Sequence, residues 1–123
     1  MYEPHTVGWV ELATRDINKA REFYSGLFGW ETRESSNAPT DYIEFAAGGQ
    51  YRGGLLQMME EWAGLPPHWA VYFLTPDTDA AVAKVKELGG QVKRGPFDIP
   101  HVGRTAVVSD PQGAHFYVIT LKM

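Results

Sequence analysis

The sequence predicts an α+β fold made of two βαβββ modules in tandem, and three observations lead to this prediction. Two stretches of 22 residues, starting at Val10 and Val71, align without a gap at an offset of 61 residues (71 − 10). Each copy has the pattern of a strand, then a helix, then a glycine that leads into another strand. Three more strand-like runs follow each helix. A ferredoxin-like sandwich would have one strand too few in each repeat.

Each predicted helix has recognisable start and stop signals. Asp16 and Asp77 are expected to be N-caps, because a carboxylate can accept hydrogen bonds from the free N–H groups of the first turn. Gly29 and Gly90 are expected to reverse the chain after the helices. The apolar stripes that should face the core are Ala20, Tyr24 and Leu27 in one helix and Ala81, Val85 and Leu88 in the other.

The remaining strands and the linker complete the predicted architecture. Strands are expected over residues 30–34, 42–46 and 51–58, and over residues 91–93, 104–109 and 114–121. The single domain, residues 1–123, would consist of module one (about 5–58), a linker (59–67) and module two (about 68–121). With each helix on the outside, the free sheet faces are expected to form one curved, cup-shaped mixed sheet around a hollow.

The composition excludes several classes of function. The chain has no cysteine, which rules out disulfides, thiolate zinc sites and thiol nucleophiles. Its formal net charge is −4 and it has no basic stripe, so a nucleic-acid partner is not expected. No apolar run approaches the ~20 residues of a membrane span. Because the first residues also lack the pattern of a signal peptide, we expect a cytoplasmic protein without a membrane partner.

Three stretches of the chain carry a family resemblance. DINKAREFYSGLFGWE, DTDAAVAKVKELGG and GRTAVVSDPQGAHFYVI, in this order, resemble the vicinal oxygen chelate superfamily of glyoxalases, bleomycin-resistance proteins and extradiol dioxygenases. The likeness runs through nearly the whole chain. WVELATRD, GGLL and DIPHVGR further resemble a bacterial glyoxalase-like branch whose reaction is not established. The resemblance implies the paired-module fold described above.

The resemblance also implies where a metal would bind. Metal-dependent members place one ligand on the first and fourth strand of each module. Carried over to this chain, the positions fall on Trp9, Ala70 and Tyr117, with the remaining one at Leu56 or Gln57. Trp, Ala and Tyr cannot assemble an octahedral site of nitrogen and oxygen ligands. We therefore expect no metal at the usual position and no other cofactor.

Strand alternation predicts which side chains line the hollow. An aromatic lining with a few polar groups is typical of small-molecule pockets, so the expected partner is a small organic ligand. For Trp9, Tyr72 and Tyr117, simple core filling is the alternative. The expected ligand-binding residues are Trp9, Glu11, Gln57, His68, Tyr72, Arg104, His115 and Tyr117.

Glu11 is the most unusual of these residues, because it lies in mid-strand between Val10 and Leu12. Burial among aromatic side chains raises the pKa of a carboxyl group unless a cation or hydrogen-bond donors attend it. Such perturbed acids are candidates for function. The alternative is a structural ion pair with Arg104.

Two functions remain open. One is a protein that binds a small organic molecule without the usual four-ligand metal site. The other is an enzyme of lyase, isomerase or dioxygenase type acting on a small carbonyl or aromatic metabolite, with Glu11 and Tyr117 as catalytic residues. A relocated divalent metal held by Glu11, His68 and His115 would be a two-His, one-carboxylate set. A homodimer is expected, because exposed sheet edges and apolar faces favour symmetric pairing.

Overall fold

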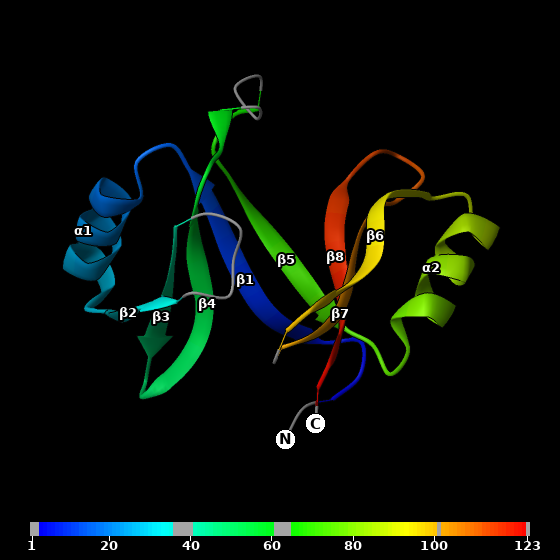
Figure 1. Ribbon diagram of the computed structural model, residues 1–123, viewed down its shortest axis with the longest axis horizontal. Helices are drawn as coiled ribbons and strands as arrows, with labels where there is room; N and C mark the ends of the chain where they lie inside the picture. Colours follow the sequence, from blue (N-terminus) through cyan, green and yellow to red (C-terminus); the bar gives the residue numbers. More distant parts are fainter. Residues whose placement is uncertain (1–2, 36–40, 61–64, 101, 123) are drawn as a thin grey trace. The chain divides into compact units, whose positions relative to one another are not determined.

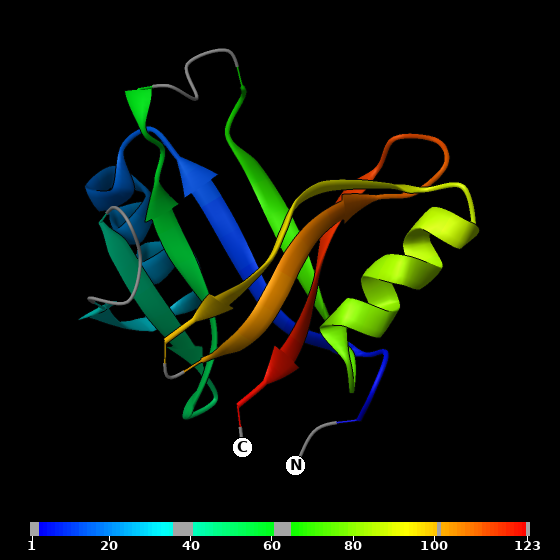
Figure 2. The same cartoon turned by 45° about the vertical axis from the view of Figure 1, so that its right-hand side comes forward.

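The computed structural model describes residues 3–35, 41–60, 65–100 and 102–122. The chain divides into two compact units, one of residues 9–70 and the other of residues 1–8 and 71–123. In each unit one helix lies across one face of a group of four strands (Figures 1 and 2). The order of the elements is βαβββ twice, so the predicted α+β class and the tandem modules are confirmed. No helix among the described residues is long and apolar enough to cross a membrane.

The first module has the strand order β2-β3-β4-β1. Its β1 and β4 strands are parallel, and the other neighbours are antiparallel. Part of the linker that follows, residues 61–64, lies outside the described residues. The elements of this module are β1 (Val7–Thr14), α1 (Ile17–Phe28), β2 (Glu31–Ser35), β3 (Tyr42–Ala47) and β4 (Gln50–Gln57).

The second module repeats this arrangement in the order β5-β8-β7-β6. As expected, β5 and β8 lie side by side and are parallel. The β6 strand is longer than predicted and continues through the segment GPFDI, because two register shifts against β7 accommodate the extra residues. The elements of this module are β5 (His68–Leu74), α2 (Thr78–Glu87), β6 (Gln91–Ile99), β7 (Gly103–Ser109) and β8 (His115–Leu121).

Both helices begin at the predicted N-caps. A carboxylate oxygen of Asp16 accepts a hydrogen bond from the Lys19 N–H at 3.0 Å, and Asp77 accepts one from Ala80 at 3.1 Å. Gly29 ends α1 in the left-handed conformation with φ 72°. In the second module the prediction is off by one residue, because α2 ends at Glu87 and the left-handed glycine is Gly89 with φ 92°.

Each module buries its own apolar core between the helix and the strands. Val10 and Leu12 belong to the first core, which confirms that they face α1. The prediction was wrong for the last residue of each helical stripe: Leu27 is 58% exposed and Leu88 is 65% exposed. Both leucines follow the last residues through which their helices contact a core, Tyr24 and Val85.

The two N-caps lead to a prediction about stability. Replacing Asp16 or Asp77 with Ala leaves first-turn N–H groups without the carboxylate acceptor, so each change should lower the free energy of unfolding by about 0.5–2 kcal/mol. Urea denaturation measures this loss. The control is Glu22→Ala, at an exposed position of α1. This change should alter the free energy of unfolding by no more than about 0.5 kcal/mol. Cap variants as stable as the wild type would contradict the assignment.

Candidate functional site

A buried carboxylate marks the first module. Among the residues that the structure describes, Glu11 is the only charged one that is buried, with 8% of its surface exposed. Because its neighbours Val10 and Leu12 pack toward α1, Glu11 lies on the opposite face of the sheet. The predicted orientation of this strand is therefore confirmed. Burying a charged group is unfavourable unless hydrogen bonds or an opposite charge compensate, so its contacts decide how it is held.

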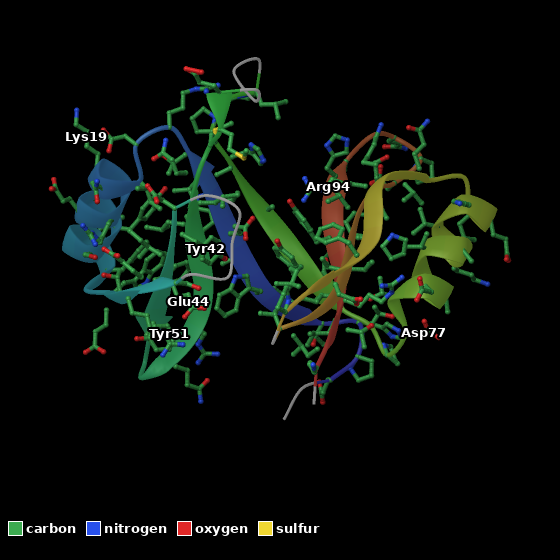
Figure 3. The ribbon with its side chains drawn as sticks, in the orientation of Figure 1. Lys19, Tyr42, Glu44, Tyr51, Asp77 and Arg94 are labelled. Atoms are coloured by element: carbon green, nitrogen blue, oxygen red, sulfur yellow. The ribbon has the colours of Figure 1, made fainter. Side chains whose placement is uncertain are left out.

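The Tyr42 hydroxyl connects Glu11 to Trp9. This hydroxyl donates a hydrogen bond to Oε1 of Glu11 at 3.0 Å and accepts one from the indole Nε1–H of Trp9 at 2.9 Å. All three residues belong to one module. Trp9 and Glu11 are on β1, and Tyr42, which Figure 3 labels, is at the start of β3. The indole N–H and the tyrosine hydroxyl each therefore donate to an acceptor, and the donor to the Glu11 carboxylate is a neutral group.

The residue between these side chains is Gly54 of β4. In the sheet register, Gly54 pairs with Glu11 on one side and with Glu44 on the other. A Cβ atom at position 54 would overlap the ring of Tyr42. The missing side chain is what lets the tyrosine lie across the strand and reach Glu11.

The surroundings of Tyr42 keep its hydroxyl protonated. Burial raises the pKa of Tyr42 well above its usual value, and the negative charges of Glu11 and Glu44 act in the same direction. The hydrogen bond from Trp9 opposes this shift by stabilising the phenolate, but it is outweighed. Tyr42 is therefore a hydrogen-bond donor to Glu11 throughout the neutral pH range.

Sequence reasoning missed Tyr42, although a signal for it exists. In the segment Tyr42–Phe45 the apolar residues Ile43 and Phe45 belong to the helix-side core. Period-2 alternation then puts Tyr42 and Glu44 on the same face as Glu11. The glycine pair in β4 marks a place where another group approaches the backbone closely.

Gln57 of β4 and His68 of β5, two other predicted ligand-binding residues, have side chains close to backbone groups. The side-chain oxygen of Gln57 accepts a hydrogen bond from the Ile17 N–H at 3.0 Å, and its amide group donates to the carbonyl of Arg15 at 2.7 Å. Gln57 thus fastens the end of β4 to the start of α1. His68 is exposed, and its Nδ1 lies 2.8 Å from the carbonyl oxygen of Pro66. Ligand contact by these two residues stays a prediction.

In the second module the predicted aromatic residues meet each other. Tyr72 and Tyr117 are paired in the parallel register of β5 and β8, and their rings stack with centroids 4.1 Å apart. Tyr117 lies between Phe116 and Val118, which pack toward α2, so the stack is on the other face of the sheet. His115 is exposed at the start of β8.

Arg104 forms two ion pairs on the surface of the second module. Its Nε and Nη2 atoms bind the two carboxylate oxygens of Asp79 at 2.9 and 3.1 Å, and Nη1 binds Asp98 at 3.1 Å. These hydrogen bonds raise the pKa of the guanidinium group further. The alternative ion pair between Arg104 and Glu11, like ligand contact by Arg104, stays a prediction.

The residues at the inherited metal positions do not fit a divalent metal. Trp9 and Ala70 have no suitable ligand atom, and Tyr117 supplies a stacked phenol in place of a carboxylate. The remaining position can be inferred from the repeat. At the offset of 61 residues (72 − 11), Glu11 corresponds to Tyr72. Tyr72 pairs with Tyr117 in the sheet, and Glu11 pairs with Gly54. Gly54 is therefore the counterpart of Tyr117 in the first module. The fourth position thus falls on Gly54 more naturally than on Leu56 or Gln57, and glycine has no side-chain ligand. Among the described residues, no three His, Asp or Glu side chains gather in a group that could hold a metal ion.

Comparison with known families decides where this arrangement belongs. The model of the Glyoxalase/Bleomycin resistance protein/Dioxygenase superfamily matches residues 6–118. The chain belongs to this superfamily. The resemblance seen in the sequence is confirmed, and it covers both modules of the superfamily fold.

Two relatives in the superfamily are similar over nearly the whole chain. CFP32 of Mycobacterium tuberculosis, named as a glyoxylase, is 42% identical over 126 residues, which cover 95% of this chain and 44% of that protein. The anthracycline biosynthesis protein DnrV of Streptomyces peucetius is 32% identical over 130 residues, covering 95% of this chain and 47% of that protein. The chain therefore spans less than half the length of these relatives.

Solved structures show the same fold at low sequence identity. Streptomyces coelicolor methylmalonyl-CoA epimerase in complex with 2-nitronate-propionyl-CoA has a TM-score of 0.75 and 18% identity, with 98% of this chain and 100% of that chain covered. A Bacillus halodurans protein, BH1468, has a TM-score of 0.79 and 14% identity, with coverage of 98% and 97%. These likenesses establish the fold.

The raised pKa of Tyr42 predicts how stability depends on pH. Below about pH 10 the residue is protonated in both folded and unfolded chains, so its contribution is complete. As the pH rises above 10, the unfolded chain loses this proton while the folded protein retains it, and the free energy of unfolding falls. Tyr42→Phe removes this dependence. At pH 8 we expect the variant to be about 1–3 kcal/mol less stable than the wild type, because Glu11 loses a donor.

Urea denaturation at pH 8 and pH 11 tests this expectation. The difference between wild type and Tyr42→Phe should shrink by about 1 kcal/mol at the higher pH, since one unit of pKa displacement corresponds to about 1.4 kcal/mol. A difference that is the same at both pH values would contradict the assignment.

Proposed function

We propose that this chain binds a small organic molecule on the sheet face that carries Trp9, Tyr42 and Glu11, without a metal at the inherited positions. The observation that carries the proposal is the buried Glu11 carboxylate, hydrogen-bonded by Tyr42 at 3.0 Å. A carboxylate in mid-strand is an expensive way to stabilise a sheet, because an apolar residue would need no compensating donors. Its position on the sheet face away from the helix-side core supports a role in recognition.

The chemistry of these residues suggests the class of ligand. A carboxylate has two oxygens with about four acceptor positions in all, so it suits a ligand with a hydroxyl or N–H donor. The indole of Trp9 offers a flat surface on which a ring or an extended carbonyl group can lie. A planar molecule with carbonyl and hydroxyl groups matches this carboxylate and indole of the first module.

The names of similar proteins are compatible with this ligand class. DnrV is an anthracycline biosynthesis protein, and anthracyclines are planar polycyclic molecules with carbonyl and hydroxyl groups. The epimerase structures of the same fold hold CoA esters, which also present a carbonyl group. The two classes of compound are therefore the first probes to use.

An enzymatic role is the second candidate, and the contact between Tyr42 and Glu11 favours it. A carboxylate fixed in place by a neutral donor can accept a proton from a substrate carbon next to a carbonyl group, or from a hydroxyl group. The proton would move to Glu11, and the Tyr42 hydroxyl would keep the carboxylate oriented during the transfer. Return of this proton from Glu11 to a carbon of the resulting enolate would complete an isomerisation, whereas dioxygenase chemistry would need a redox metal.

Glu11→Gln separates recognition from structural support. Glutamine keeps the volume and an oxygen acceptor for Tyr42, so the free energy of unfolding should change by less than about 1 kcal/mol. Affinity for methylmalonyl-CoA or for an anthracycline, whichever the wild type binds in isothermal titration calorimetry, should fall at least about tenfold, because hydrogen bonds to charged groups are the stronger ones.

Glu22→Gln is the control for this experiment. Glu22 is exposed on α1, which packs on the opposite face of the sheet, so its loss should leave affinity unchanged. If both variants bind as tightly as the wild type, Glu11 has no role in recognition. If Glu11→Gln destabilises the fold by about 3 kcal/mol or more, its role is structural.

The inherited metal positions lead to a further prediction. Protein purified without added metal should contain far less than one equivalent of Fe, Ni, Zn or Mn by mass spectrometry. EDTA should leave its Tm unchanged, because removal of a bound metal would lower the Tm by mass action. Stoichiometric metal that disappears in both His68→Ala and His115→Ala would instead support the relocated set of Glu11, His68 and His115.

A further inference from the structure

An open groove lies in the second module, between α2 and the strands β5 and β8. Its volume is about 610 Å³, which is within the usual range of small-molecule sites. All of its lining residues belong to the compact unit of residues 1–8 and 71–123. Several of them, such as Val85 and Phe116, pack on the helix side of the sheet. The groove is therefore on the opposite face from the stack of Tyr72 and Tyr117.

The duplication explains why the second module has this groove. At the offset of 61 residues (85 − 24), Val85 of α2 corresponds to Tyr24 of α1. In the first module the ring of Tyr24 stacks on Trp30 with centroids 5.5 Å apart, and both rings pack between the helix and the sheet. At the position of Trp30 the second module has Gln91, which is exposed. The rings that fill this space in the first module are thus missing from the second.

Two phenylalanine rings line the groove on the side of the sheet. Phe73 of β5 and Phe116 of β8 contact edge to face, with centroids 5.7 Å apart and planes at 77°. Phe73 remains 36% exposed, and Leu88 at the end of α2 is 65% exposed. A ligand that covers these side chains removes apolar surface from water. An aromatic ligand fits best, because offset or edge-to-face contacts with the phenylalanine rings add to the gain from buried area.

A positive charge borders this apolar surface. Lys84 of α2 lines the groove, and its ammonium group is 3.4 Å from a carboxylate oxygen of Glu87. Both side chains are exposed, so this ion pair contributes little, and the three N–H donors of the lysine can serve a second anion as well. Asp77 also lines the groove, but its carboxylate caps α2 by accepting from the Ala80 N–H. Lys84 therefore favours a ligand with a negative charge.

His5 adds a polar group from the chain start. Its φ of 69° lies in the left-handed region that residues other than glycine rarely adopt. The His5 N–H donates a hydrogen bond to the Leu74 carbonyl at 2.6 Å, which holds the residue in this conformation beside the groove. An imidazole carries at least one N–H donor in either tautomer, so His5 can donate to an oxygen of an anionic ligand.

We propose that this groove binds a small aromatic carboxylate, with its ring against Phe73 and Phe116 and its carboxylate toward Lys84. The ring of the ligand would take the place in the second module that the ring of Tyr24 takes in the first. This proposal does not rest on the proposed function, whose residues Trp9 and Glu11 belong to the other module.

Nuclear magnetic resonance of the ¹⁵N-labelled protein locates the ligand. The probe is 2-naphthoate, which should shift the backbone amide signals of Leu74, Lys84 and Leu88 in a saturable way. The neutral counterpart 2-naphthylmethanol should bind about threefold more weakly, because it cannot pair with the lysine. Shifts confined to residues 9–70, or no saturable shift up to about 1 mM ligand, would overturn the proposal.

Val85→Tyr tests the groove by restoring the ring of the first module. The tyrosine ring should occupy the space of the ligand ring, so affinity for 2-naphthoate should fall at least about tenfold. Ala83→Tyr is the matched control, since Ala83 is exposed on the same helix outside the groove and its variant should keep the affinity of the wild type. A folded Val85→Tyr protein that binds as tightly as the wild type would overturn the site.

Lys84→Gln tests the class of ligand at an exposed position that does not endanger folding. Affinity for 2-naphthoate should fall about threefold, while affinity for 2-naphthylmethanol should stay the same. Lys86→Gln is the matched control, because Lys86 is exposed on α2 and does not line the groove. Equal affinity of the wild type and Lys84→Gln for 2-naphthoate would overturn the assignment of a carboxylate ligand, whether or not Val85→Tyr folds.

Discussion

The hydrogen bond from Tyr42 to Glu11 determines how one face of the first module is organised. Glu11 lies in mid-strand and is only 8% exposed, so its carboxylate needs a hydrogen-bond donor, which is the Tyr42 hydroxyl. The oxygen of the same hydroxyl can also accept a hydrogen bond, and it accepts one from Trp9. The tyrosine can reach across β4 only because position 54 is glycine. Four positions on three strands are thus linked, and a change at any of them alters the environment of the carboxylate.

The internal duplication shows how the same framework accommodates different chemistry. The strand pair Glu11 and Gly54 in the first module corresponds to Tyr72 and Tyr117 in the second. The first pair combines a carboxylate with a glycine that the ring of Tyr42 covers. The second pair has two stacked tyrosine rings at the same two positions. The backbone hydrogen bonds of a parallel strand pair do not depend on these side chains, so the face turned away from the helix can change without loss of the fold.

Much of the fold could be predicted from the sequence, because the relevant signals are local. The N-caps Asp16 and Asp77 act on N–H groups three residues away, and strand alternation correctly assigned Val10, Glu11 and Leu12 to their faces. Tyr42 was missed because its contact joins residues 31 positions apart in the chain, and only the sheet register brings them together. The leucines at the ends of the helices were misassigned because a periodic stripe gives the direction of a side chain but not where the core ends.

The position of Trp69 has a consequence for the folding of the chain. This residue belongs to β5, yet its ring packs against Trp30 and Phe45 of the first module, with centroids 6.4 and 6.3 Å away. Residues before β1 contact the end of β5, because the His5 N–H donates a hydrogen bond to the Leu74 carbonyl at 2.6 Å. Each compact unit therefore includes a short segment from the other half of the sequence: residues 1–8 belong with 71–123, and residues 68–70 belong with the first module. Cutting the chain between residues 58 and 67 would therefore separate each compact unit from a segment of its own.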